Sequence, residues 1–190
     1  GVLQSSFVSP TRGQGKDNLW DPFLNAYDAS PWFKKVAQYL KQESKRLGLM
    51  LYHRQQTFLI FPGKRLAAHV QAANNVTLRG ATRCYATIDE LGHLSFASNG
   101  TKRASIHDGT EIFTSLTNSL RTVRSAAESR RAQLGDHHAI DGYMVNVSSP
   151  LDIGDPIEQR AAIADKSFRM YFTRFPTWEV NPKENEDLIR

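Results

Sequence analysis

The pattern of apolar and polar positions over residues 31–47 predicts the clearest helix of the chain. Ser30 is a favoured N-cap, Pro31 stands at the first helical position, and Gly48 follows the last apolar residue. At about 100° per residue, the apolar and the basic or amide positions fall on opposite arcs. The apolar arc holds Trp32, Phe33, Val36, Ala37, Tyr39, Leu40 and Leu47, and the polar arc Lys34, Lys35, Gln38, Lys41, Gln42, Lys45 and Arg46. We therefore expect one face to pack and the other to be positive.

Glu43 is the one residue of this segment that the pattern does not explain, because it falls in the middle of the apolar arc. A carboxylate on a buried face must find a partner or take up a proton. We expect Glu43 to pair with Arg46 or another cation, or to reach the rim of the apolar arc. The alternative is a functional carboxylate.

The rest of the chain alternates loosely between predicted strands and helices. We expect one bent or two short strands over 49–61, a short helix over 65–74, a hairpin of 79–89 with 93–98, an amphipathic helix from about Thr110 to Arg130 capped by Asp108 or Thr110, a strand over 140–147, a short helix from 155 and a strand over 168–175. No repeated βαβ spacing or Gly-rich crossover is present. The pattern favours an α+β fold, with a mixed or antiparallel sheet packed by two main amphipathic helices.

The length of 190 residues and the hydrophobic content of 40% fit a single domain with a core of its own. We place this domain over residues 19–175. Residues 1–18 are predicted to form an N-terminal arm and residues 176–190 a C-terminal tail, because neither segment holds enough apolar surface to order itself. No stretch approaches the roughly 18 to 20 apolar residues of a transmembrane helix.

Positive charge is concentrated in one block of the sequence. Between residues 34 and 65 there are eight basic residues and one acid, whereas the whole chain has a net charge of +5. The predicted binding residues for an anionic partner are Lys34, Lys35, Lys41, Lys45, Arg46, Arg54, Lys64 and Arg65. Residues 136–165 carry six acids against the single Arg160, so the two signs are separated along the chain.

Candidate catalytic, metal and cofactor motifs are weak. Asp136, His137, His138 and Asp141 could supply ligands, but successive side chains in a strand or turn diverge, so a polar loop is the expectation. The runs 13–16 and 62–65 resemble phosphate loops without the spacing that surrounds a phosphate with backbone amides. The single cysteine, Cys84, is predicted to be a thiol in the core. We predict no metal and no cofactor, and enzymatic activity stays open.

These observations favour a non-catalytic interaction subunit of a larger multi-protein assembly, which docks to other protein subunits through its basic face and its terminal arms. The first sixteen residues lack acids and contain Arg12 and Lys16, as mitochondrial transit segments do, so the expected location is mitochondrial and otherwise cytoplasmic. The alternative is an RNA-binding or other nucleic-acid-binding protein, including an organellar ribosomal protein. In that case the basic residues meet phosphates while exposed members of Tyr52, Phe58 and Phe61 stack on bases. The second alternative is an enzyme with an unrecognised site.

Overall fold

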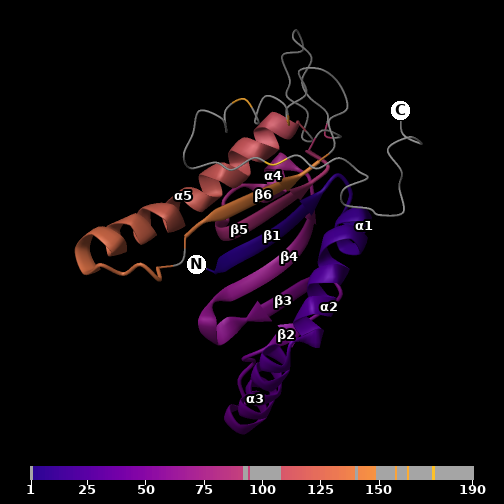
Figure 1. Ribbon diagram of the computed structural model, residues 1–190. Helices are drawn as coiled ribbons and strands as arrows, with labels where there is room; N and C mark the ends of the chain where they lie inside the picture. Colours follow the sequence, from indigo (N-terminus) through magenta and orange to yellow (C-terminus); the bar gives the residue numbers. More distant parts are fainter. Residues whose placement is uncertain are drawn as a thin grey trace.

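The computed structural model describes residues 2–91, 94, 108–139, 141–148, 157, 162 and 173. Its elements are β1 (Leu3–Ser9), α1 (Arg12–Gly15), the π-helical η1 (Lys16–Trp20), α2 (Asp21–Ala29), α3 (Pro31–Leu47), β2 (His53–Arg54), β3 (Phe58–Phe61), the 3-10 turn η2 (Pro62–Lys64), β4 (Leu66–Ala72), α4 (Asn75–Leu78), β5 (Thr82–Asp89), α5 (Gly109–Leu134) and β6 (Tyr143–Val147). Across the described residues the strands form one six-stranded sheet in the order β2-β3-β4-β1-β5-β6 (Figure 1).

The sheet is mixed, which confirms the predicted α+β class. Strands β4, β1, β5 and β6 run parallel, and β3 and β2 continue the sheet as antiparallel strands beyond β4. Successive residues of β1 point to opposite faces, so Phe7 and Val8 enter different cores. Val8 packs with the residues of α5 around Leu116, and Phe7 packs with Trp20 and Leu24. Helices therefore cover both faces of the sheet (Figure 1).

The prediction of an N-terminal arm over residues 1–18 is wrong for the part that the structure describes. Residues 3–9 form β1, which lies inside the sheet between β4 and β5. Ser6 and Ser9 are fully buried, as is Trp20 in the helical segment that follows. Serines that make a segment look polar in composition are small enough to lie in the interior of a sheet paired on both sides. Residues 176–190, the predicted tail, lie outside the described residues.

The predicted helix over 65–74 is also wrong, because this segment forms β4. Its alanines favour a helix, yet the strand pairs with β1 on one side and β3 on the other, and Ala67 and Val70 are buried. Pairing on both edges outweighs a weak local propensity. The predicted strands over 79–89 and 140–147 are confirmed as β5 and β6. The predicted elements over 93–98 and 168–175, and the short helix from 155, lie outside the continuously described segments.

Both long helices form where their capping signals predict. Ser30 accepts a bond from the backbone nitrogen of Phe33, and Gly48 ends α3 at a φ of 64°. Asp108 caps α5 in the same way, and Gly135 ends it at a φ of 62°. Positive φ suits glycine because it has no Cβ. However, α3 does not pack as expected: it extends beyond the β2 end of the sheet, and none of its residues is buried (Figure 1).

At the carboxyl end of β1, two neighbouring connections leave the sheet on opposite faces. The connection from β1 to β4 passes over the face that carries Trp20 and Leu24. The connection from β4 to β5 returns past β1 through α4, whose Leu78 belongs to the core on the opposite face. In open sheets with parallel strands, ligands bind in the crevice outside the carboxyl ends where neighbouring connections leave on opposite faces. The carboxyl ends of β1 and β5 are therefore the expected place for functional residues.

A cationic groove as the candidate functional site

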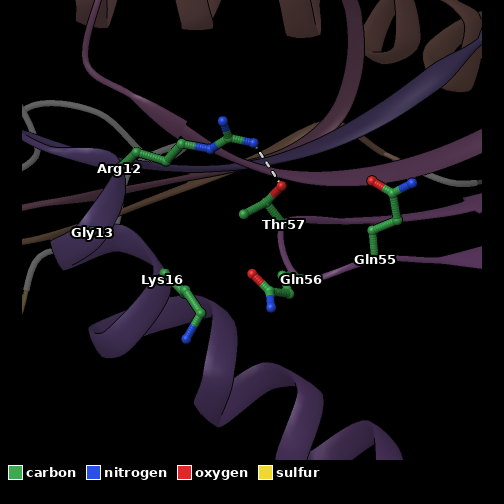
Figure 2. A pocket seen from close by; sticks show the side chains of 6 residues that line it. All are labelled: Arg12, Gly13, Lys16, Gln55, Gln56 and Thr57. Carbon is green, nitrogen blue, oxygen red and sulfur yellow. Dashed lines mark hydrogen bonds between the residues drawn. The ribbon is translucent and has the colours of Figure 1, made fainter.

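Two adjoining hollows lie near the carboxyl end of β1, with volumes of about 670 and 750 Å³. The first is lined by Arg12, Gly13, Lys16, Gln55, Gln56 and Thr57 (Figure 2). The second is lined by Lys16, Asp21, Leu24, Lys41, Tyr52, His53, Arg54, Gln55 and Gln56. Because Lys16, Gln55 and Gln56 belong to both, we treat them as one feature, called the groove. It separates the helical segment 12–29 from residues 52–57.

Helical spacing directs the first two cations into the groove. Thr11 caps the segment by accepting a bond from the backbone nitrogen of Gln14 at 3.2 Å. Residues four apart share one side of a helix, so Arg12 and Lys16 lie together. Gln14 and Asn18 lie together on another side, and their amides contact Glu90 at 3.5 Å and Asp89 at 3.2 Å. The helical segment is thereby joined to the end of β5, while Arg12 and Lys16 line the groove with residues of the β2–β3 hairpin.

Gly15 sets how closely this helical segment approaches the sheet. A Cβ at this position would lie 2.9 Å from Cγ2 of Val70 and 3.1 Å from Cβ of Ser9. Contacts this short require a shift of the neighbouring atoms, so only glycine fits the observed spacing. Since Gly15 stands next to Lys16 in the sequence, the close approach also fixes the position of the groove's cations.

Ion pairs and hydrogen bonds hold the cations in place. Nη2 of Arg12 donates to Oγ1 of Thr57 at 2.6 Å (Figure 2). Nζ of Lys16 lies 2.6 Å from Oδ2 of Asp21, and this hydrogen bond raises the pKa of Lys16. The Lys41 ammonium lies 5.6 Å from the centroid of the Tyr52 ring, within cation–π range. With Arg54 of β2, three separate segments of the chain therefore present cations to one groove.

Arg54 lines the groove and is held in a bidentate ion pair by Asp28, which lies outside the lining. Its Nη1 and Nη2 donate to the two carboxylate oxygens of Asp28 at 2.6 and 2.8 Å. The hydrogen bond from Arg54 lowers the pKa of Asp28, so the pair stays charged over a wide pH range. The lining of the groove carries four cations and one carboxylate, that of Asp21. The groove is therefore suited to an anionic ligand.

The predicted basic block does not form one surface. Lys41 and Arg54 line the groove. Lys34, Lys35, Lys45 and Arg46 are exposed along α3, and Lys64 and Arg65 lie in the turn before β4. The carbonyl of Arg65 accepts a bond from the nitrogen of Leu3, so this turn stands at the opposite end of β1, about 20 Å from Ser9.

Sequence reasoning missed Arg12 and Lys16 as partners of Lys41 and Arg54. The run 13–16 resembled a phosphate loop, but residues 1–18 were expected to be an arm, so neither cation was placed in a site. The available signal was local: a Val8-Ser9 strand end followed by Thr11, a favoured N-cap. Residues 55–57 carry no distinctive pattern, and only the folded hairpin brings them opposite Arg12.

A second exposed surface lies on α3 and its C-terminal extension. We define the α3 strip as Trp32, Tyr39, Leu47, Leu49 and Met50, which are all exposed, with Trp32 at 64% and Tyr39 at 61%. Glu43 forms a salt bridge with Arg46, whose Nε lies 3.0 Å from both carboxylate oxygens. The expected pairing of Glu43 is confirmed. Hydrogen bonding to Arg46 lowers the pKa of Glu43 and keeps the pair ionised.

The aromatic residues expected to stack on bases are not exposed. Tyr52, Phe58 and Phe61 are all half-buried. Tyr52 packs on Phe61 with ring centroids 5.5 Å apart, and Phe58 lies between His53 and His69 at 5.5 and 6.1 Å. These rings therefore support the hairpin and the core beside Phe7 rather than forming a free platform.

The region around His137 and His138 has the expected form of a polar loop. Both histidines are exposed, and Asp136 and Asp141 pair with Arg130 and Arg131 of α5 at 2.7 and 3.0 Å. In the part of the chain that the structure describes, no three metal-ligating side chains gather in one place. Cys84 lies half-buried on β5, with its sulfur 3.5 Å from the carbonyl oxygen of Gln4.

Comparisons with known proteins complete the description of the site. None of the helices within the described residues is both long and apolar enough to cross a membrane. Searches of protein-family models, of curated proteins and of solved structures find no match to this chain.

Proposed function

We propose that this protein is a non-catalytic interaction subunit that docks into a larger protein assembly through α3. The observation that carries the proposal is that α3, a helix of 17 residues with an apolar arc, buries none of them. A helix with such a pattern ordinarily covers its apolar face within the fold. Contiguous exposed apolar surface with a polar border is typical of protein interaction sites.

The chemistry of α3 indicates the kind of partner. Trp32 and Tyr39 are seven residues apart, so they lie along one line of the helix as two large anchors. Lys35, Lys45 and Arg46 are exposed on the same helix. A helix of this type fits an apolar groove on another protein, and its cations favour a groove bordered by carboxylates.

The test is a pull-down with the full chain as bait, carried out with and without nuclease. We expect a fixed set of proteins that survives nuclease and is lost with the double variant Trp32→Ala/Tyr39→Ala. The matched control is Val76→Ala/Leu134→Ala, which removes side chains that are 64% and 73% exposed on other helices. Recovery of the same proteins by the Trp32→Ala/Tyr39→Ala variant would contradict docking through α3.

The mitochondrial location stays a prediction. Its support was the acid-poor N-terminal segment, and residues 3–9 of that segment form β1 within the sheet. The composition of this segment therefore has a structural explanation. Fractionation of cells that express the tagged chain checks the location, and recovery in the cytoplasmic fraction would remove it from the proposal.

Nucleic-acid binding is a second candidate, and a different observation favours it. Trp32 and Tyr39 are the most exposed aromatic side chains of α3, a helix that also carries exposed lysines, whereas Tyr52, Phe58 and Phe61 are half-buried. An aromatic ring beside cations is the arrangement that binds single strands by stacking and by phosphate contact. Here the binding constant of a single-stranded oligonucleotide should fall log-linearly with salt. Changing Lys35 and Lys45 to Gln should reduce that slope by about 1.4, and an unchanged slope would exclude this role for α3.

A further inference from the structure

We propose that the groove binds a small phosphate-bearing ligand of nucleotide size. This site is separate from the α3 strip and goes beyond the docking function. Its first support is the convergence of Arg12 and Lys16 with Lys41 and Arg54, from segments that are far apart in the sequence. Asp21 is the one carboxylate of the lining. Outside the lining, Asp17 lies 3.7 Å from Lys16 and Asp28 pairs with Arg54, so the four cations leave a small excess of positive charge for a phosphate.

The position of the groove supports the same ligand. Arg12 follows Ser9, the last residue of β1, by three positions, and the connections after β1 and β4 cover opposite faces of the sheet. Sheets with parallel strands bind their ligands at this type of divergence. Gly15 brings the segment that holds Arg12 and Lys16 close to β4 and β1, which places both cations beside the strand end.

The donors of the groove are already oriented. The bond to Thr57 uses one of the five N–H donors of Arg12 and holds its guanidinium at the first hollow. Asp21 similarly directs the ammonium of Lys16, which belongs to both hollows. The oxygens of a phosphate can accept charge-assisted hydrogen bonds from a planar guanidinium and from an ammonium.

The remaining lining fits the polar body of such a ligand. Gln55 and Gln56 provide amide donors and acceptors, and Nε2 of Gln55 lies 3.1 Å from Nε2 of His53. Leu24 is the single aliphatic residue of the lining. Volumes of about 670 and 750 Å³ lie within the range of about 300 to 1,000 Å³ typical of small-molecule sites.

The experiment is isothermal titration of the full chain with ADP and, separately, with inorganic pyrophosphate. We expect both probes to bind. Each charged contact that is lost should lower the affinity for ADP by about tenfold. The variants are Arg12→Gln/Lys16→Gln and, from another segment, Lys41→Gln. The matched control is Lys35→Gln/Lys64→Gln, which removes the same charge as the first variant from residues outside the groove. Its affinity for ADP should stay within about twofold of the unchanged protein.

Three results would overturn the proposal. The first is no detectable binding of either probe. The second is an equal loss of ADP affinity in the control variant, which would mean a non-specific charge effect. The third is a single-stranded oligonucleotide that binds through Arg12 and Lys16 when ADP does not, which would make the groove a path for a strand. The variant Trp32→Ala/Tyr39→Ala should bind ADP normally, so failure of the docking proposal remains distinguishable from failure of this one.

Discussion

Replacing Gly15 with Ala tests the close approach on which the groove depends. On helix propensity alone the change should stabilise the protein, because Gly in a helix is less favourable than Ala by about 1 kcal/mol. The backbone of Gly15 is right-handed helical, with φ of −61° and ψ of −33°, so Ala meets no backbone strain there. The opposing effect is steric, since the new Cβ would lie 2.9 Å from Cγ2 of Val70 and 3.1 Å from Cβ of Ser9.

The magnitude follows from the difference between two neighbouring glycines. Gly13 also lies in α1, and a Cβ there meets only Oγ1 of Thr11 at 4.0 Å. Gly13→Ala should therefore gain up to about 1 kcal/mol in the free energy of unfolding. Extra volume in a packed interior costs about 1 to 3 kcal/mol. Gly15→Ala should consequently be less stable than Gly13→Ala by about 1 to 3 kcal/mol.

The assay is urea unfolding of both variants and of the double variant Gly15→Ala/Val70→Ala. Truncating Val70 removes the Cγ2 atom nearest to the new Cβ, so a double-mutant cycle should show favourable coupling between the two changes. Gly15→Ala should also lower the affinity of the groove for ADP, because relief of the close contact displaces the helical segment that carries Lys16. Equal stability of Gly15→Ala and Gly13→Ala would refute the reasoning.

Three further predictions concern stability. Asp108→Ala should lower the free energy of unfolding by about 1 kcal/mol in urea, because its side chain caps α5 at the nitrogen of Glu111; an unchanged midpoint would contradict the cap. Burial, and secondarily Arg83, lower the pKa of His69 from 6.5, so stability should fall as the pH drops below that value, where the unfolded chain binds the proton first. His69→Gln should flatten this dependence in thermal scans, and an unchanged profile would assign it to other groups. Trp32→Ala/Tyr39→Ala should leave stability within about 0.5 kcal/mol, as expected for exposed side chains, and a larger loss would show that α3 packs in solution.

The two long helices could be predicted because their signals are local. Ser30, Pro31 and Gly48 act within one turn of the ends of α3, and the pairing of Glu43 with Arg46 spans three residues. These interactions need no knowledge of the rest of the fold. Burial is different, since no residue of the apolar arc of α3 is fully buried where the helix extends beyond the sheet, and Trp32 and Tyr39 are left exposed.

The site could be predicted only in part. The sequence identified Lys41 and Arg54 as cations for an anionic partner, and both line the groove. It also placed Lys64 in the same surface, because closeness along the chain was taken as closeness in space. The turn that carries Lys64 instead lies at the far end of β1. The number of charges can be counted along a sequence, but which charged side chains share a surface depends on packing.

By itself, the sequence determined the ends of α3, the start of α5, strands within 79–89 and 140–147, the α+β class and the surplus of positive charge. Capping, side-chain periodicity and composition act over a few residues, so they can be recognised without the fold. Only the tertiary structure decided that residues 3–9 and 66–72 are strands and that Arg12 and Lys16 meet Lys41 and Arg54. Strand pairing joins residues that are about sixty positions apart, as in the pair of Leu3 and Leu66. The local strand propensity of a segment does not specify which other strand it pairs with.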